Sequence, residues 1–121
     1  VAAVGEGVTG IAVGDRVYGG QPLTGTYAEQ VLYDASEVYP LPDNTSFSQG
    51  ASLRGPYYTA HYALFGKGRG TPGETVLVHG ASGGVGIAAV QIARAAGFVV
   101  IGTASSEKGR ELVKQEGAYH V

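Results

Sequence analysis

Apolar residues in the first part of the chain come in short runs that are separated by turn residues. Strands this short and this closely spaced predict a small β-barrel or sandwich over residues 1–43. Pro40 and Pro42 should end the last strand, because proline has no N–H to give to a ladder. The candidate strands are Val1–Val4, Arg16–Tyr18, Tyr27–Tyr33 and Glu37–Leu41.

A helical pattern begins at Ser46, and either Ser46 or Ser48 can cap it. Pro56 lies inside this pattern and should break or kink the helix, because its ring blocks the bond to the carbonyl four residues earlier. Residues 67–73 contain glycine and proline and predict a loop. The apolar residues at roughly helical spacing are Ala51, Leu53, Tyr58, Tyr62 and Phe65.

The last third alternates apolar strands with helices. Residues 75–79 and 98–101 are continuous apolar runs, which are typical of strands buried on both faces of a parallel sheet. We predict a helix over residues 85–96, a left-handed cap at Gly97, and a second helix from Ser105 or Ser106 to about Glu116. The start of a third strand follows at residues 118–121. This βαβα order predicts right-handed crossovers. The predicted inward face of the first helix consists of Val85, Ala88, Ala89, Ile92 and Ala96.

Composition excludes several classes of protein. Glycine makes up 21 of 121 residues without a collagen period, and 44% hydrophobic with 15% charged residues is too apolar for a disordered chain. A net charge of −2 does not favour nucleic acid, and the chain has no cysteine and only three scattered histidines. No apolar run reaches the roughly 18 residues of a membrane span. The N-terminus does not resemble a signal peptide and the chain has no methionine, so we interpret the sequence as a piece of a longer cytoplasmic protein.

A glycine-rich turn, Ala81-Ser82-Gly83-Gly84-Val85-Gly86, stands between the first apolar strand and its helix. It has the spacing of the G-x-G-x-x-G dinucleotide fingerprint, with alanine in the first position. Position 81 should make a tight turn, Gly83 should let the backbone approach a pyrophosphate, and Gly86 should let the helix lie close to the strand. The N–H groups at the helix N-terminus would then bind phosphate.

Two other readings of this turn are less favoured. A P-loop would require Gly-Lys-Ser/Thr, whereas Gly86 is followed by Ile87. Residues 80–84 also read as G-x-S-x-G with Ser82 as a nucleophile, but His120 is the only histidine after Ser82. A turn that only packs a helix on a sheet is the structural alternative.

The second apolar strand indicates which nicotinamide cofactor is bound. An acidic residue usually follows this strand and holds the ribose 2′-hydroxyl of NAD. Here residues 103–106 are Thr-Ala-Ser-Ser, and Lys108 and Arg110 come soon after. Hydroxyls and nearby cations suit a 2′-phosphate, so we predict NADPH. The alternative for Lys108 is a solvated helix position.

Several motifs together resemble the medium-chain dehydrogenase/reductase superfamily, and within it the zeta-crystallin-like NADPH:quinone oxidoreductases. The resemblance covers essentially the whole chain and implies an internal fragment. It implies part of a GroES-like β-barrel catalytic domain at residues 1–54, followed by the first half of a Rossmann-type parallel sheet, the cofactor domain, at residues 55–121. The motifs are Gly14-Asp15-Arg16-Val17, Gly25-Thr26-Tyr27-Ala28-Glu29, Pro56-Tyr57-Tyr58-Thr59-Ala60 and the run from Val76 to Gly97.

The resemblance also assigns roles to individual residues. Thr59 matches a threonine beside the nicotinamide ring, and Ser105 matches a position near the adenosine ribose. Thr59 could instead bond back to a helix carbonyl, and Val85 could be a core residue. Catalytic residues stay unknown, and packing is the favoured role for Tyr57, Tyr58 and His61. The predicted cofactor-binding residues are Thr59, Ser82, Gly83, Gly84, Val85, Gly86, Ser105 and Lys108.

Many members of the superfamily hold zinc, but two features of this sequence argue against it. Only eight residues, Tyr18 to Gly25, occupy the place of the four-cysteine lobe that binds structural zinc. Gly55 stands at the position of a late ligand of the catalytic zinc and has no ligand atom, whereas a zinc site normally has three protein ligands. The first two ligand positions of the family precede Val1. The sequence therefore predicts no metal.

The resemblance implies an enzyme that transfers hydride from NADPH to a small electrophilic acceptor, a quinone or a conjugated enone. Such acceptors need no Lewis-acid metal, which agrees with the zinc-free prediction. An enoyl reductase of the same superfamily and a non-catalytic, crystallin-like NADPH-binding protein are the alternatives. We expect a homo-oligomer for the full-length protein, no nucleic-acid or membrane partner, and no activity from residues 1–121 alone.

Overall fold

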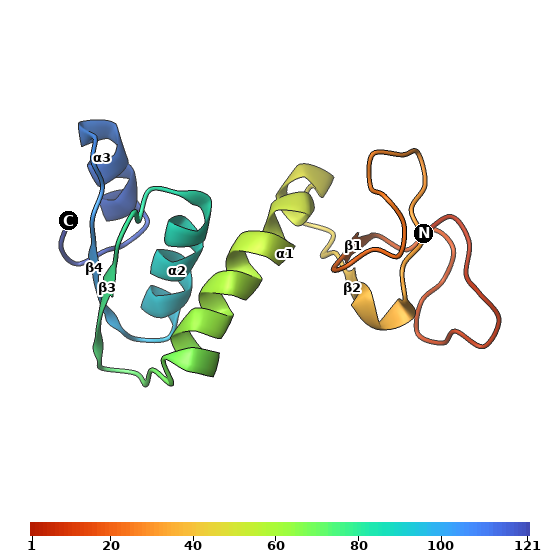
Figure 1. Ribbon diagram of the computed structural model, residues 1–121, viewed down its shortest axis with the longest axis horizontal. Coiled ribbons are helices and arrows are strands. Elements are labelled where there is room, and N and C mark those ends of the chain that lie inside the picture. Colours follow the sequence, from red (N-terminus) through yellow and green to blue (C-terminus); the bar gives the residue numbers. More distant parts are fainter. The chain divides into compact units, whose positions relative to one another are not determined.

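The computed structural model describes all 121 residues, which form two compact units, Val1–Arg54 and Gly55–Val121 (Figure 1). The boundary between the units lies within helix α1 (Phe47–His61), so this one helix belongs to both. No helix has the length and apolar character needed to cross a membrane.

The N-terminal unit contains one antiparallel ladder, in which β1 (Val17–Gly19) pairs with β2 (Val38–Pro40). A short 3₁₀ helix, η1 (Ala35–Glu37), precedes β2. These strands confirm two of the four strand predictions, the first shifted by one residue and the second shortened. Residues 1–54 do not close a barrel by themselves, since this ladder and an isolated bridge between Pro22 and Tyr33 are all the β-structure they contain.

The predictions of strands at Val1–Val4 and Tyr27–Tyr33 are wrong. The backbone of Val1 bonds to the turn at Gly14 and Asp15 rather than to a strand. The second segment has only the bridge at Tyr33, and Tyr27 is fully exposed. An apolar alternation forms a strand only where a neighbouring segment supplies a ladder and a covered face, and neither segment has both.

Contacts of Arg16 and Leu41 anchor the start of α1 within the N-terminal unit. The Arg16 guanidinium donates a hydrogen bond to the carbonyl of Thr45 and lies 4.4 Å from the centre of the Phe47 ring. Leu41 is buried beside Gly50, where an added Cβ would lie only 2.8 Å from the leucine side chain. A larger residue at this position of the helix would force the Leu41 side chain to shift.

Glu37 links two segments of this unit, because its carboxylate accepts from the Gln21 N–H at 3.0 Å and from Arg54 at 3.2 Å. These contacts, the Gln21 bond first, lower the pKa of Glu37. The stability that these contacts add to the fold is complete above the ordinary pKa of 4.5 and is lost as the pH falls through the lowered native value.

We expect Glu37→Gln to be less stable than wild type at neutral pH, with the difference shrinking in acid. Urea unfolding across pH checks this, and a difference that does not depend on pH would contradict it.

The C-terminal unit has the predicted βαβα order. Strand β3 (Thr75–Val78) pairs in parallel with β4 (Val99–Gly102), from Thr75 opposite Val99 to Val78 opposite Gly102. Helices α2 (Gly84–Ala95) and α3 (Glu107–Gln115) follow the two strands. A parallel bridge between Ile101 and His120 begins the third strand.

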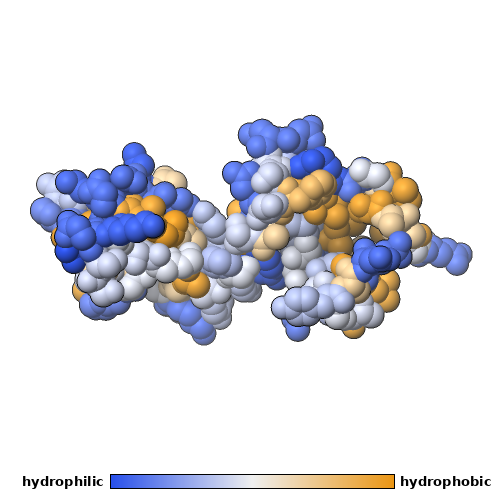
Figure 2. Space-filling model, turned by 90° about the horizontal axis from the view of Figure 1, so that it is seen from above, coloured by the Kyte–Doolittle hydropathy of each residue, from blue (hydrophilic) through white to orange (hydrophobic).

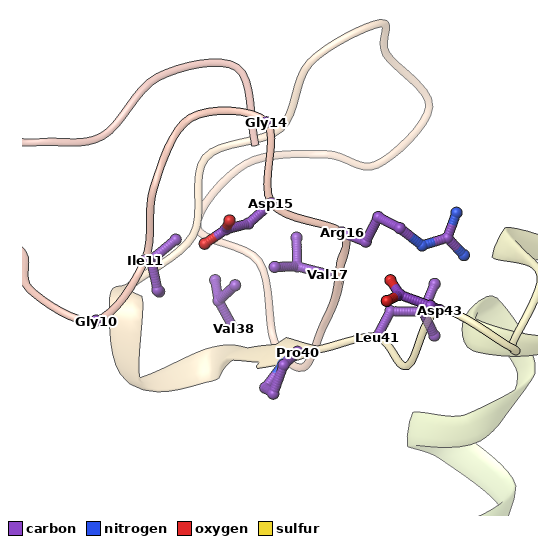
Figure 3. A pocket seen from close by; sticks show the side chains of 10 residues that line it. All are labelled: Gly10, Ile11, Gly14, Asp15, Arg16, Val17, Val38, Pro40, Leu41 and Asp43. Atoms are coloured by element: carbon purple, nitrogen blue, oxygen red, sulfur yellow. The ribbon is translucent and has the colours of Figure 1, made fainter.

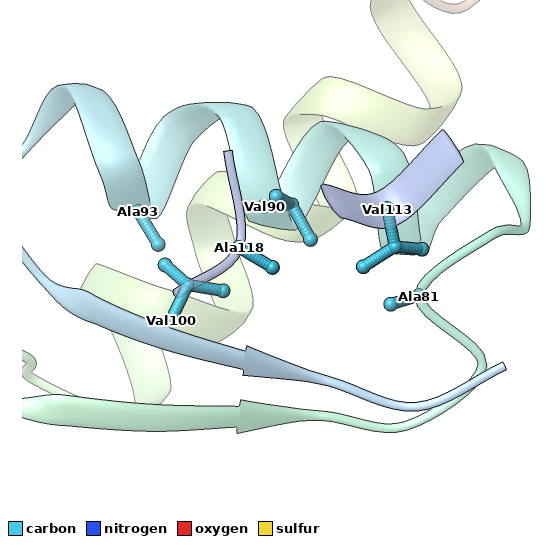
Figure 4. Close-up of a cluster of buried hydrophobic side chains, with 6 residues drawn as sticks. All are labelled: Ala81, Val90, Ala93, Val100, Val113 and Ala118. Carbon is cyan, nitrogen blue, oxygen red and sulfur yellow. The ribbon is translucent and has the colours of Figure 1, made fainter. Parts of the chain in front are cut away.

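Small side chains build the core between the sheet and the helices (Figure 4). Ala93 and Val90 of α2 and Val113 of α3 meet Val100 of β4 there, so both helices cover the same face of the sheet. The apolar runs are typical of strands buried on both faces, but in this chain only one face of the sheet is covered. Leu77 on the other face is 53% exposed.

Hydrophobic side chains also remain at the surface of both units (Figure 2). They include Val13 and Leu23 in the N-terminal unit and Leu77 and Val99 in the C-terminal unit. Leu77 and Val99 lie on the face of the sheet that α2 and α3 leave uncovered.

Helix α1 runs through Pro56 without ending, so the predicted break is wrong. Proline removes one helical hydrogen bond. The next turn of the helix packs against α2 through Tyr57 and Ala60, and this packing offsets the loss. A π-helix, η2 (Tyr62–Lys67), continues directly from α1.

The predicted inward face of α2 is only partly right. Ala88 and Ala89 are buried against α1, as expected, but Val85 is 45% exposed. Val90 and Ala93 are buried on the sheet although the pattern did not place them there. The helix is covered on two sides, by the sheet and by α1, so a single apolar stripe could not describe it.

Candidate cofactor-binding site

The turn after β3 is made by Gly80, not by the residue at position 81. Gly80 has φ +63°, a left-handed conformation that glycine adopts without steric cost. Ala81 is fully buried in the core and lies 3.1 Å from the place where a Cβ on Gly102 would stand. The interpretation of Ala81 as the tight-turn residue is therefore wrong, and alanine at this position fills the core.

Gly86 has the close-packing role that the sequence predicts. A Cβ on Gly86 would lie 2.6 Å from the Cα of Ala81 and would also collide with the carbonyl oxygen of Gly80. No side chain can move aside there, because both neighbours are backbone. Only glycine lets the first turn of α2 lie this close to the end of β3.

The N-terminus of α2 is open. Its cap residue, Gly83, has no side chain to accept a hydrogen bond. The N–H groups of Ser82, Gly84 and Val85, all exposed residues, make no hydrogen bond within the chain. Helix α3 differs, since the Ser106 hydroxyl accepts from the Gly109 N–H at 3.1 Å. Unpaired N–H groups at the positive end of the helix dipole form a binding place for an anion such as phosphate.

Thr103, the first residue after β4, holds the glycine-rich turn in place. Its hydroxyl accepts from the Gly80 N–H at 3.2 Å and lies 3.3 Å from Nδ1 of His79. Its backbone carbonyl accepts from the Ala81 N–H at 2.8 Å. The sequence analysis missed this role. A hydroxyl residue directly after one strand, beside the glycine-rich turn of a neighbouring strand, is the signal that could have revealed it.

Replacing Thr103 by valine keeps the shape and the backbone bonds but removes the hydroxyl acceptor. We expect a loss of about 1 kcal/mol in the free energy of unfolding, because the Gly80 N–H loses its partner. Urea unfolding of the full-length protein measures this. Thr75→Val is the matched control, since Thr75 is exposed and its hydroxyl makes no hydrogen bond. Equal stability of the two variants would mean that the Thr103 hydroxyl contributes nothing.

The first turn of α3 meets the glycine-rich turn at Gly109. A Cβ on Gly109 would lie 3.0 Å from the Ser106 hydroxyl and 3.1 Å from the Ser82 hydroxyl. Ser106, not Ser105, caps the helix, so Ser105 stays exposed and its hydroxyl makes no hydrogen bond. The structure therefore brings Ser82 beside the start of α3 at the carboxyl end of both strands, where open α/β sheets bind ligands.

The two basic residues at the start of α3, Lys108 and Arg110, differ in whether they form an ion pair. Lys108 is exposed and forms no ion pair, whereas Arg110 pairs with Glu107. No contact places Lys108 against the glycine-rich turn, so its role near a phosphate stays a prediction.

Thr59 lies on the part of α1 that belongs to the C-terminal unit. Its side chain is exposed and makes no hydrogen bond, so the bond back to a helix carbonyl does not form. Pro56, three residues earlier, lies against the turn, since a Cβ on Gly84 would be 3.8 Å from its ring. Buried packing is not the role of Tyr58 and His61, because both are exposed; their rings contact those of Tyr62 and Phe65. Tyr57 is partly buried.

Two cavities in the structure lie away from these residues. The larger, about 530 Å³, is in the N-terminal unit, where Asp15, Arg16 and Asp43 line it together with apolar side chains (Figure 3). The smaller, about 270 Å³, lies between α2 and Glu116. None of the predicted cofactor-binding residues lines either one. No group of three or more histidine and acidic side chains gathers anywhere in the structure.

No protein-family model matches the sequence. A quinone oxidoreductase of Rattus norvegicus is 52% identical to it over 121 residues, which are 100% of this chain and 37% of the relative. The structure of Escherichia coli quinone oxidoreductase complexed with NADPH is 35% identical with a TM-score of 0.87, covering 99% of this chain and 37% of that one. Over its whole length the chain is therefore similar to quinone oxidoreductases, the zeta-crystallin-like group of the medium-chain dehydrogenase/reductase superfamily.

The chain is also similar to the enoyl reductase CurK. Their identity is 38% and the TM-score is 0.80, over 98% of this chain and 35% of CurK. The chain spans little more than a third of the length of each of these relatives. The expected fold class is confirmed: a Rossmann-type parallel sheet is preceded by part of a GroES-like domain.

Proposed function

We propose that this chain carries the pyrophosphate-binding part of an NADPH-dependent oxidoreductase that reduces a quinone or a conjugated enone. The observation that supports it best is the open N-terminus of α2, with its unpaired N–H groups at the carboxyl end of two parallel strands. The structural alternative, a turn that only packs a helix on a sheet, explains Gly86 but not the uncapped residues 82–85. The NADPH bound by the Escherichia coli relative supports the choice of cofactor.

The residues present fit the pyrophosphate of such a cofactor. The N–H groups of Ser82, Gly84 and Val85 would hold its oxygens, and Gly83 leaves the approach free of a Cβ. Ser105 and Lys108 would accommodate the 2′-phosphate. Thr59 would lie beside the nicotinamide, from which the bound cofactor supplies a hydride to the acceptor. Thr103 positions the turn and touches no ligand in this scheme.

We propose that this reaction needs no zinc. Gly55 has no side chain that could act as a ligand, and the sequence contains no cysteine. An electron-poor quinone or enone accepts hydride without a Lewis acid. The absence of a zinc ligand at position 55 is therefore compatible with the proposed acceptor. Within this proposal, residues 1–54 belong to the catalytic domain and residues 55–121 to the cofactor domain.

An enoyl reductase is the second candidate, and the similarity to CurK favours it. The two activities share the glycine-rich turn and differ in the acceptor. Cytoplasmic localisation and a homo-oligomer remain predictions.

Steady-state assays of the full-length protein test the proposal. We expect NADPH-dependent reduction of a quinone that persists in the presence of a chelator, with substoichiometric zinc by elemental analysis. Turnover of an enoyl thioester without quinone turnover would instead support the second candidate. Binding of NADPH with no turnover of either acceptor would indicate a non-catalytic protein.

A further inference from the structure

A chain of hydrogen bonds joins α1, α2 and the end of α3. The Tyr57 hydroxyl donates to Oε1 of Gln91, and Nε2 of Gln91 donates to the Glu116 carboxylate at 2.6 Å. All three residues are partly buried. Nothing in the proposed chemistry uses Gln91 or Glu116, so this series of hydrogen bonds needs a separate explanation.

The charge of Glu116 gives the hydrogen bonds one direction. An ionised carboxylate only accepts, so the amide nitrogen of Gln91 must face Glu116 and its oxygen must face Tyr57. The Tyr57 hydroxyl then has to donate. The tyrosine is thereby held in one orientation, which an apolar contact alone would not impose.

The position of Thr59 depends on this part of α1. The Thr59 side chain is exposed and makes no hydrogen bond, so its position follows that of the helix backbone. Several contacts that this segment makes with α2 and the glycine-rich turn are apolar and involve small groups: Ala60 packs on Ala88 and Ala89, and Pro56 lies near Gly84. Such contacts between small groups permit a helix to slide or rotate, whereas the bond from Tyr57 to Gln91 is directional.

We propose that Gln91 is a positioning residue of the cofactor site: with Glu116 it clamps Tyr57, and so keeps Thr59 in a fixed place relative to the glycine-rich turn. This inference rests on the proposed function, in which Thr59 lies beside the nicotinamide. The phosphates would bind at residues 82–85, which Gln91 does not touch. Loosening the clamp should therefore impair hydride transfer without weakening cofactor binding.

The test compares Gln91→Leu and Tyr57→Phe with wild type in the full-length protein. We expect kcat for quinone reduction to fall about tenfold in each variant, because small displacements of reacting groups are costly. The Kd for NADPH, measured by fluorescence titration, should change by less than about twofold. Glu116→Gln should keep most of kcat, since its amide oxygen can still accept from Nε2 of Gln91. Gln115→Leu is the matched control, because Gln115 is exposed and bonds only to Glu111 within α3.

A second readout separates this inference from the proposed function. Hydrogen exchange of the amides of residues 57–61 should be faster in Gln91→Leu and unchanged in Gln115→Leu. If wild type is active and its variants keep both kcat and the protection of amides 57–61 from hydrogen exchange, the clamp is overturned and the proposed function is unaffected. A wild type that neither binds NADPH nor reduces quinone would overturn the function, and exchange in α1 would still decide whether the clamp exists. A parallel loss of kcat and NADPH affinity would mean a general structural role and would overturn the positioning role.

Discussion

Replacing Gly86 by alanine should unfold or severely weaken the cofactor unit. The new Cβ would stand 2.6 Å from the Cα of Ala81 and would collide with the Gly80 carbonyl, so backbone must move on one side or the other. Overpacking of this kind costs about 3 kcal/mol when rigid atoms are involved. Because the same displacement shifts the N–H groups of Gly84 and Val85, NADPH binding should be lost as well. Urea unfolding and fluorescence titration of the full-length protein measure the two effects.

Gly83→Ala is the matched control for this prediction. Gly83 has φ −82° and ψ 168°, which alanine adopts readily, and its Cβ would lie 3.4 Å from the nearest atom, the Gly80 carbonyl oxygen. The free energy of unfolding should stay within about 0.5 kcal/mol of wild type. NADPH affinity should nevertheless fall, because the methyl group would occupy the approach to the pyrophosphate. If Gly86→Ala proved as stable as Gly83→Ala, the close approach of α2 to the end of β3 would not matter.

The C-terminal unit could be predicted in detail because its signals are local. Two apolar runs, Gly97 at φ +84° and the Ser106 cap each act within a few residues of the element they start or end. The spacing from Gly83 to Gly86 likewise reports a local requirement, a helix that begins against the end of its own strand. For these features, sequence neighbours are also neighbours in space.

Features that depend on distant partners could not be predicted in the same way. Thr103 bonds to Gly80, 23 residues away, and Tyr57 bonds to Gln91, 34 residues away. No local pattern marks either pair. The missing strand at Val1–Val4 has the same origin, since an apolar segment becomes a strand only when another segment pairs with it. The exposed face at Leu77 reflects which elements cover the sheet, not the strand's own sequence.

The second large effect concerns the choice between NADPH and NADH. Ser105 is exposed and its hydroxyl makes no hydrogen bond, so Ser105→Asp should leave the fold intact. A carboxylate there would repel a 2′-phosphate, whereas it could accept a hydrogen bond from the 2′-hydroxyl of NADH. We expect the KM for NADPH to rise about 30-fold, corresponding to a like-charge penalty of about 2 kcal/mol. The KM for NADH should stay constant or fall.

The control for this substitution adds the same charge at the other end of α3. Gln115→Glu places a carboxylate on the last residue of the helix and should change neither KM appreciably. Higher salt should reduce the effect of Ser105→Asp, because the site is exposed and charges there are screened. If Ser105→Asp raised both KM values equally, the residue would act on cofactor binding in general, and the case for a 2′-phosphate beside Ser105 would be lost.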